Sequence, residues 1–381
     1  MNRKKNSKLR KLIFYIFFSC IILLATVFGL FWLSLLILLY VLIYLVFFEL
    51  FLFRLLRRQR FLIFGLKAFF FLLILFSLKV FVIEPYRVPS GSMENTFRGG
   101  DIIFVNKLIY GPRFMRRGKS TFVDGESNVY YIDKSKSKPL KFSGIDGVRR
   151  GDVFVYQMSK DFFMVKRCMG LPGDTINMLK GNVQINNQVY SPSKNIKQFY
   201  LITTRNNKER YHFLSRIGIQ NDIKRVNDHV FSGFFTVEEI EKIKEVPVLD
   251  SIQIVTGESK TELLPAFPID EWTVDNFGPV VVPRRNSTIR LNSANYLLYN
   301  RLLAEHEQVT VLEKKGKYYH LGQGIKNYTF KNNYYFMLGD NRSNSIDSRY
   351  SGFIPESFII GKVNWSLSYG DENIFSVNAV K

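Results

Sequence analysis

The longest apolar runs of the chain lie in its first 83 residues. Residues 12–53 and 61–83 contain few polar side chains, and basic blocks precede and separate them at 1–11 and 54–60. A helix that crosses a bilayer needs about 20 apolar residues. The pattern therefore predicts two membrane-spanning helices in 12–53, forming a hairpin that turns near residues 29–34, and a third span in 61–83.

The basic blocks also predict an orientation. Because basic flanks stay in the cytoplasm, residues 1–11 and 54–60 are expected inside and everything after residue 83 outside. A cleaved signal peptide does not fit, because the apolar region is too long and no small-residue cleavage site follows it. A single bent span in 12–53 is the alternative, and it would place the C-terminal part in the cytoplasm.

Beyond residue 83 the hydrophobic pattern changes to short runs. These are rich in β-branched and aromatic residues and are bounded by Gly, Asn and Asp, which is typical of strands. The predicted strands are 100–110, 151–158, 162–169, 182–190 and 334–338. We therefore predict a mainly β fold, in which N-terminal transmembrane helices precede an extracytoplasmic β-rich domain with an α/β insertion.

The insertion is the segment 191–327, which is more polar and less regular than the core on either side (84–190 and 328–381). Two runs in this region, 235–246 and 292–307, keep apolar residues at helical spacing and predict helices. The first has a capping box made by Thr236 and Glu239, and the second begins at Asn292 or Ser293. The pattern assigns the insertion no role.

The composition narrows the possible partners. The 381 residues carry a net charge of +21, which favours nucleic acid or an anionic membrane surface. Much of the excess lies beside the predicted spans, where anionic lipid accounts for it; a nucleic-acid-binding membrane protein remains the alternative. The two cysteines, Cys20 and Cys168, lie in a span and in the soluble part and are not expected to pair. No metal-binding motif is present, so we predict neither a metal nor a cofactor.

Candidate chemistry begins with PSGSMENTF at 89–97. In an extended segment, Ser90 and Ser92 point the same way, so that one hydroxyl can attack a carbonyl while the other donates to the oxyanion. Gly91 between them allows a substrate backbone to approach closely. The alternative is an ordinary turn or linker.

A serine nucleophile needs a base, and Lys166 is the candidate. A lysine has an unperturbed pKa of about 10.4, and burial in an apolar site lowers it. Lys166 lies in the apolar strand FFMVKRCMGLPGD, although an ordinary lysine on an edge strand would show the same pattern. A Ser-His-Asp triad is the other possibility. It would draw on the four histidines His212, His229, His306 and His320.

The last block is FMLGDNRSNSIDSRYSGFIP at 336–355, which follows a predicted strand. It is dense in charged residues: Asp340, Arg342, Asp347 and Arg349. A solvated polar loop is one interpretation, but such a loop next to a buried strand more often builds a site.

The blocks EPYRVPSGSM, GDIIFVNK, RRGDVFVY, MVKRCMGLPGD and LGDNRSNSIDSRYSGFIP together resemble the bacterial type I signal peptidases. These leader peptidases are membrane-anchored Ser/Lys endopeptidases with an extracytoplasmic β-rich catalytic domain. The matched blocks cover about 81–110, 149–176 and 328–364. Their order makes the resemblance specific, whereas no single block would.

The resemblance implies a role for each matching residue. Ser92 would be the nucleophile and Lys166 the neutral general base. Ser90, with the backbone N–H of Ser92, would form the oxyanion hole, and Ser345 would orient the lysine. Met93 and Gly339 would help to shape the site, and two ion pairs would brace it: Asp340 with Arg167, and Asp347 with Arg349.

The resemblance also implies a function. The protein would remove signal peptides from exported preproteins after small residues, at sites of the Ala-x-Ala type, through an acyl-enzyme. It would be a multi-pass protein of the bacterial inner membrane, with membrane lipid and the secretion machinery as further partners and no nucleic acid. The sequence departs from the family at Asn95, Ser343 and Ser351, where Pro, Asp and Trp are usual. An inactive scaffold of the same fold is the alternative.

Overall fold

The structure is a computed structural model of the 381-residue chain. It describes residues 2–27, 30–45, 60–114, 120–125, 128–133, 140–159, 162–205, 218–219, 223–256, 266–369 and 375–380. The chain divides into two compact units. The first comprises 1–84, 106–115 and 139–147, and the second comprises 85–105, 116–138 and 148–381.

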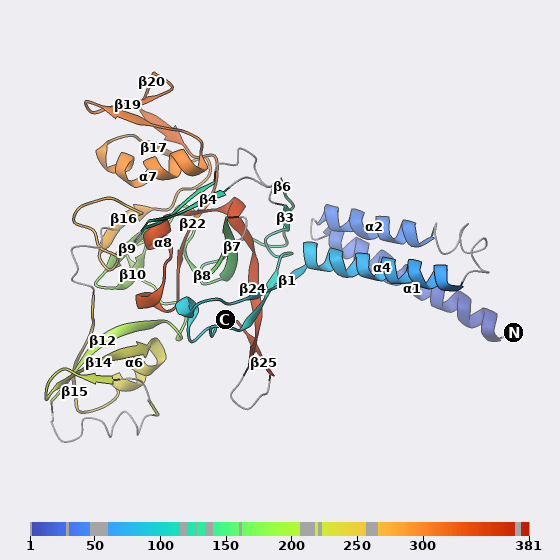
Figure 1. Cartoon of the computed structure of the whole chain (residues 1–381), viewed down its shortest axis with the longest axis horizontal. Helices are drawn as coiled ribbons and strands as arrows, with labels where there is room; N and C mark the ends of the chain where they lie inside the picture. Colours follow the sequence, from blue (N-terminus) through green and yellow to red (C-terminus); the bar gives the residue numbers. More distant parts are fainter. Residues whose placement is uncertain are drawn as a thin grey trace. The chain divides into compact units, whose positions relative to one another are not determined.

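The first unit is built on three apolar helices, α1 (Asn2–Val27), α2 (Phe31–Leu45) and α4 (Arg60–Phe81), shown in blue in Figure 1. Hydroxyl groups join them: Thr26 and Ser34 lie 2.9 Å apart between α1 and α2, and the Tyr40 hydroxyl donates to the Leu73 carbonyl at 3.2 Å. Within the described residues, one helical stretch, 64–81, is long and apolar enough to cross a membrane. The apolar stretches 15–27 and 31–43 are shorter.

Two loops of the first unit contact the end of α4. The Lys107 ammonium donates to the Lys79 and Val80 carbonyls at 3.2 and 3.1 Å and pairs with Glu84 at 2.7 Å. A cation at this position satisfies carbonyls that lack a partner within the helix. The short pair β3 (Arg113–Phe114) and β6 (Leu140–Lys141) also belongs to this unit.

The main sheet confirms that the protein is mainly β (Figure 1). Its order is β1-β2-β24-β7-β8-β22-β23, with β25 paired to β24. The strands are β1 (Ile83–Arg87), β2 (Ile102–Asn106), β7 (Val153–Ser159), β8 (Phe162–Gly170), β22 (Tyr334–Leu338), β23 (Ile354–Pro355), β24 (Ile359–Tyr369) and β25 (Phe375–Ala379). Strand β8, which carries Lys166, is therefore interior and not an edge strand.

A second sheet has the order β11-β10-β9-β16. Its strands are β9 (Thr175–Leu179), β10 (Asn182–Ile185), β11 (Gln188–Val189) and β16 (Phe277–Val281). Side chains from this sheet and from β22, such as Ile176, Val280 and Phe336, share one buried apolar cluster. Strand β16 comes from the segment 191–327, so part of the predicted insertion is paired with core strands.

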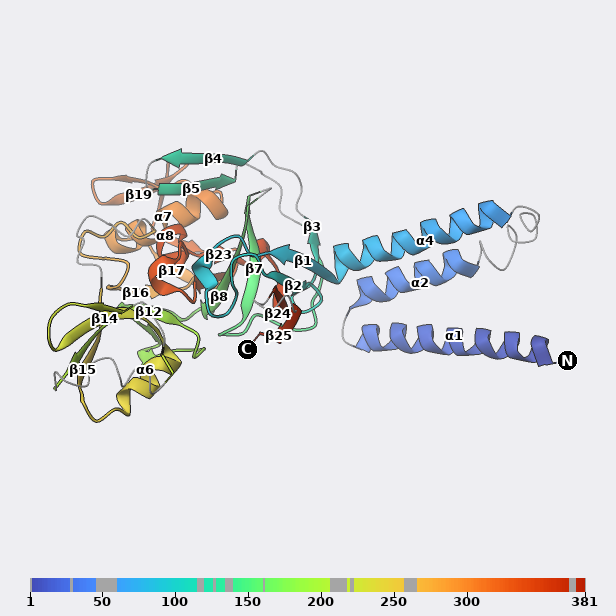
Figure 2. The same ribbon diagram turned by 60° about the horizontal axis from the view of Figure 1, so that its bottom comes forward.

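The remainder of 191–327 forms smaller elements around these sheets. Strands β12 (Lys197–Thr204), β13 (Ile223–Arg225), β14 (Val230–Thr236) and β15 (Leu249–Ile254) make a sheet that lies with α6 (Val237–Lys244), as Figures 1 and 2 show. This part has its own apolar core. The capping box of Thr236 and Glu239 is confirmed at the start of α6.

The last part of the segment supplies α7 (Ser293–His306), whose N-cap is Asn292. Around it lie the pair β17 (Thr288–Arg290) with β21 (Asn327–Thr329) and the sheet of β18 (Leu312–Lys314), β19 (Lys317–His320) and β20 (Gln323–Ile325). A separate hairpin joins β4 (Ser120–Gly125) to β5 (Asn128–Asp133). Short helical turns at Gly91–Met93, Arg342–Asn344, Glu356–Phe358 and α8 (Ser348–Ser351) complete the described elements.

Candidate active site

The segment that carries Ser92 is a short turn and not the extended strand expected from the sequence. Ser90 is extended, but Gly91–Met93 form one turn of 3₁₀ helix, closed by the Glu94 N–H that donates to the Gly91 carbonyl at 3.0 Å. The two serine hydroxyls nevertheless lie 3.3 Å apart, so they share one region of the site.

A neighbouring loop explains why this turn forms. The Asn341 backbone N–H donates to the Ser92 carbonyl at 3.1 Å, and its side-chain amide donates to the Gly91 carbonyl at 3.1 Å. The turn exposes both carbonyls to these donors. A hydrogen bond to a residue about 250 positions away is a tertiary effect, which local pattern does not predict.

Lys166 projects from the interior strand β8 toward the turn. Its Nζ atom lies 2.6 Å from the Ser92 Oγ atom, to which it donates a hydrogen bond. The side chain is 3% exposed. Burial lowers the pKa of Lys166 to about 8; the Asp347 and Asp340 carboxylates act in the opposite direction, and the Arg349 cation adds to the lowering.

Ser345 lies against the same turn. Its hydroxyl is buried and, among the described residues, has no hydrogen-bond partner. Gly339 leaves the space that this serine occupies: a Cβ atom at position 339 would lie 2.1 Å from the Ser345 Oγ atom and 2.6 Å from the Ser92 carbonyl oxygen. Both distances are far below van der Waals contact, so any larger residue at 339 must displace the serine or the turn.

Two buried ion pairs flank the lysine. Arg167 contacts Asp340 at 2.7 Å, and the Thr96 hydroxyl donates to the same carboxylate at 2.5 Å. Arg349 contacts Asp347 at 2.9 Å, and the Gly339 N–H donates to that carboxylate at 3.1 Å. Met93 is fully buried, and its sulfur accepts a hydrogen bond from the Asp340 N–H at 3.4 Å.

Several contact residues were missed by the sequence reasoning. Asn341, Glu94 and Lys197 form a chain of contacts beside the turn: the Asn341 amide donates to Glu94 at 3.0 Å, and Lys197 pairs with Glu94 at 3.3 Å. Asn341 and Glu94 lie inside the sequence motifs that contain Asp340 and Ser92, and their place in these motifs could have identified them as site residues. Lys197 lies on β12, and nothing in its local sequence distinguishes it.

The three histidines in the described part of the chain do not join this site. His229 is exposed after β13, His320 contacts the Thr310 carbonyl at 3.0 Å, and His306 packs against Phe358; the fourth, His212, lies outside the described residues. None of the three described histidines is a hydrogen-bond partner of Ser92. Among the residues placed in the structure, no group of three or more metal-ligating side chains could hold a metal ion.

Comparison with known proteins shows that several signal peptidases are similar to this chain. Signal peptidase I of Buchnera aphidicola subsp. Baizongia pistaciae is 27% identical over 300 residues, which cover 77% of this chain and 72% of that protein. Signal peptidase I of Haemophilus influenzae is 25% identical over 299 residues, covering 77% and 66%. Over a shorter stretch of 117 residues, 30% of this chain and 34% of the relative, signal peptidase I of Pseudomonas aeruginosa is 36% identical.

One protein family accounts for the blocks around Ser92, Lys166 and Ser345. The sequence pattern of the family described as signal peptidase, peptidase S26, matches residues 62–245 and 277–368. These two ranges include the strands of the main sheet except β25 and the last residue of β24. They cover well over half of the chain, which therefore belongs to the signal peptidase family, peptidase S26.

Proposed function

We propose that this protein is a signal peptidase I that removes signal peptides from exported preproteins with a Ser/Lys dyad. The observation that carries the proposal is the 2.6 Å separation of the Lys166 Nζ and Ser92 Oγ atoms in a buried setting that lowers the lysine pKa to about 8. In an amine with this pKa, roughly a tenth of the molecules are neutral at pH 7 and about half at pH 8. A neutral amine at this distance can accept the hydroxyl proton.

The reaction would proceed in two halves. Ser92 Oγ attacks the carbonyl carbon of the scissile bond while its proton moves to Lys166. The oxyanion is held by the Ser90 hydroxyl and the Ser92 N–H. When the C–N bond breaks, Lys166 returns the proton to the leaving amine, and the signal peptide remains as an ester of Ser92. Water then attacks this ester with Lys166 again as base, and Lys166 returns the proton to Ser92 Oγ as the ester C–O bond breaks, which releases the signal peptide as a carboxylic acid.

The other site residues would position these groups. Ser345, whose hydroxyl is buried without a partner in the described structure and lies near the turn of Ser92, would donate to or accept from Lys166 once the lysine changes protonation. The pairs of Asp340 with Arg167 and Asp347 with Arg349 would hold the loop around it. Met93 and Gly339 would shape the space between the turn and that loop.

Substrate selection would follow from strand addition. An extended peptide that adds beside the site presents alternate side chains to it. Two shallow pockets would then accept only small residues one and three positions before the cleaved bond, as in Ala-x-Ala. The protein would span the bacterial cytoplasmic membrane three times, with the catalytic domain outside. Lipid and the secretion machinery would bring preproteins to it.

The test uses full-length protein in detergent and a preprotein with an Ala-x-Ala site, with the N-terminus of the product identified. Wild type is expected to cut after the second Ala. Ser92→Ala and Lys166→Met should each lower kcat/KM by at least about 10³-fold, and the double variant should lose no more than either single one, because the two groups act as a unit. Lys317→Met, which changes an exposed strand lysine, is the matched control. Full activity of Lys166→Met would contradict the proposed Ser/Lys dyad.

A further inference from the structure

A groove beside the turn of Ser92 is not used by the chemistry proposed above. It has a volume of about 1230 Å³, larger than the roughly 300–1,000 Å³ of typical small-molecule pockets. Gly91, directly before the nucleophile, lines it, as do residues 94–99 after it. The opposite wall is formed by residues 192–195 and Glu238, which belong to the predicted insertion.

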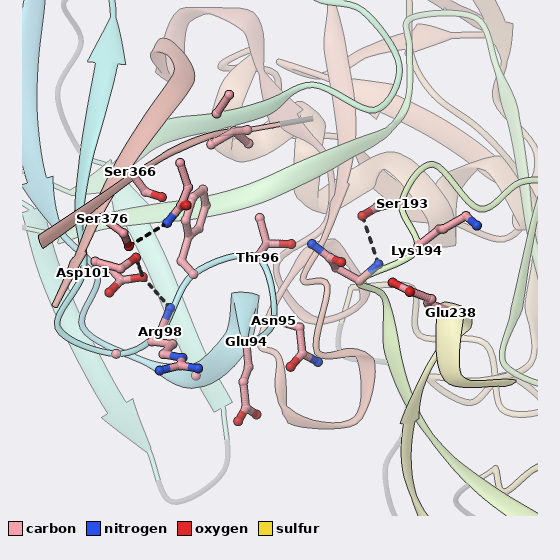
Figure 3. A pocket seen from close by; sticks show the side chains of 18 of the residues that line it. Glu94, Asn95, Thr96, Arg98, Asp101, Ser193, Lys194, Glu238, Ser366 and Ser376 are labelled. Atoms are coloured by element: carbon pink, nitrogen blue, oxygen red, sulfur yellow. Dashed lines mark hydrogen bonds between the residues drawn. The ribbon is translucent and has the colours of Figure 1, made fainter. Parts of the chain in front are cut away.

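Figure 3 shows how the labelled side chains are arranged. Arg98, Asp101, Ser366 and Ser376 gather at one end, and Ser193, Lys194 and Glu238 at the other, with Asn95 and Thr96 between them. The groove therefore extends from the β24–β25 hairpin past the segment after Ser92 to the insertion.

The hairpin presents hydroxyl and amide groups to the groove. Ser366 is paired with Asn378, and Ser368 with Ser376, so these four side chains project from one face of the two strands. Hydroxyls and amides both donate and accept hydrogen bonds, which is what the N–H and C=O groups of a peptide backbone require. Two of these groups already bond within the groove, since the Ser368 hydroxyl donates to Asp101 at 3.0 Å and the Asn378 amide donates to Ser376 at 3.3 Å. The hydroxyls and the amide keep further donor and acceptor capacity that a peptide backbone can meet.

The charged residues of the groove are of both signs. They are Arg98 and Lys194 against Glu94, Asp101 and Glu238. Nucleic acid and anionic lipid are bound by surfaces of one sign, rich in Lys and Arg, so this lining fits neither. A polar polypeptide without a strong net charge is the ligand class that both the charge and the hydrogen-bonding groups match.

We propose that the groove binds the polypeptide downstream of the cleaved bond, the first residues of the mature protein; this proposal rests on the function proposed above. An extended chain advances about 3.3–3.6 Å per residue. Because Gly91 and Glu94 flank Ser92 in the sequence and line the groove, residues one or two positions after the bond reach it. The described lining includes no residue of β1 or β8, the strands that lead into Ser92 and carry Lys166.

The proposal gives part of the insertion a role. Residues 192–195 and Glu238 form one wall, and Lys197 ties the same part of the chain to Glu94. The insertion would thus hold the substrate on the side of the leaving amine, while the core performs the chemistry. Substrate contacts of this kind are expected to lower KM and to leave kcat unchanged, because they are made equally in the ground state and the transition state.

The experiment compares two peptides on the full-length protein in detergent. Both share the same residues up to an Ala-x-Ala site. The short peptide ends there in a simple amide, with no residue after the cleaved bond, and the long peptide carries eight polar residues after it. Wild type should cleave both, with a KM about tenfold lower for the long peptide. Ser376→Trp fills the groove and should remove this advantage while leaving kcat/KM for the short peptide unchanged.

Two further variants make the result decisive. Val377→Trp is the matched control, because Val377 lies on the opposite face of β25 and is exposed; it should keep the tenfold advantage. Ser193→Trp obstructs the groove from the side of the insertion. If Ser376→Trp misfolds and no longer cleaves the short peptide, Ser193→Trp tests whether a blocked groove removes the advantage of the long peptide.

The outcomes separate this proposal from the function on which it rests. If wild type cleaves both peptides with equal KM, or if both groove variants keep the advantage, the groove does not bind the downstream chain, and the peptidase function stands. If wild type cleaves neither peptide, the peptidase function fails and this proposal fails with it.

Discussion

At the scale of single residues, the environment of Lys166 is a balance between burial and two nearby carboxylates. Burial disfavours the ammonium, whereas Asp340 and Asp347 favour it. Each carboxylate is itself paired with an arginine, at 2.7 and 2.9 Å, so much of its charge is already matched. Burial therefore dominates, and the amine is poised to lose its proton near neutral pH.

The first prediction is a pH profile. If neutral Lys166 is the base, kcat/KM should rise with pH and level off above the lysine pKa of about 8, where most of the amine is neutral. Asp347 favours the charged form, so Asp347→Asn should lower the lysine pKa and move the rising limb to lower pH. Peptide cleavage measured between pH 5 and 10 tests both points. A profile with no rising limb between pH 6 and 9 would contradict the role of Lys166.

The second prediction concerns Gly339. In Gly339→Ala the new methyl group must displace Ser345 or the Ser92 carbonyl, since it would lie 2.1 and 2.6 Å from them. We expect kcat to fall by at least about 10²-fold, because a 1 Å shift of a reacting group costs this much. Gly147→Ala, where nothing lies within 4 Å of the new atom, should retain full activity. Equal activity of both variants would show that the contact is not part of the site.

At the scale of secondary structure, the sequence predicted elements better than their connections. The strand around Lys166 and both helices of 191–327 were found because hydrophobic spacing and capping residues are local signals. The 3₁₀ turn at Gly91–Met93 was missed because Asn341 stabilises it from far along the chain. The pairing of β16 with β9 was missed for the same reason, since strand partners are chosen by burial and not by local propensity.

The third prediction concerns the loop after β22. Asp347 accepts from the Gly339 N–H and pairs with Arg349 while fully buried. Burial would raise the pKa of Asp347, but the Arg349 cation and these hydrogen bonds outweigh it, and the pKa is lowered. Asp347→Ala leaves the buried Arg349 cation with only Asp275, at 3.9 Å, as a counter-charge, so we expect a loss of about 3–5 kcal/mol in the free energy of unfolding.

Urea unfolding of the detergent-solubilised protein, followed by tryptophan fluorescence, measures this loss. The control is Asp250→Ala, which removes an exposed pair with Arg205 and should cost less than about 1 kcal/mol. Because the folded-state pKa of Asp347 is lowered, its contribution is present above the unfolded pKa and is lost as the pH falls through the folded one. The two variants should therefore converge in acid. Equal losses at neutral pH would refute a stabilising role for Asp347.

At the scale of the whole molecule, the proposed three-span arrangement determines which side of the membrane holds the site. The fourth prediction tests it in spheroplasts with a membrane-impermeant maleimide. Lys317→Cys, in an exposed part of β19, should be labelled in intact spheroplasts, whereas Lys8→Cys should be labelled only after lysis. Cys20 and Cys168 are replaced by serine and alanine beforehand. Labelling of position 8 alone in intact spheroplasts would show that the protein has the opposite orientation in the membrane.

The sequence indicated which residues make up the site, but not the space beside it. Motifs around Ser92, Lys166 and Asp340 are compact, so a resemblance identifies them residue by residue. The groove draws its walls from 94–99, 192–195 and β25, segments that are far apart in the chain and carry ordinary polar residues. Their juxtaposition depends on how the sheets pack, which no local pattern encodes.

The last prediction follows from confinement to one surface. A signal peptide that inserts in the same bilayer as the enzyme meets the site at a raised effective concentration, which can increase apparent affinity by about 10²–10⁴-fold without any new contact. In liposomes, a substrate with its apolar segment should therefore have a far lower KM than the same cleavage site in a soluble peptide. In a large excess of detergent micelles, enzyme and substrate occupy separate micelles, so the difference should shrink. A ratio of KM values that is unchanged between liposomes and dilute micelles would mean that the apolar segment contacts the protein directly, and that the spans contribute to recognition as well as to anchoring.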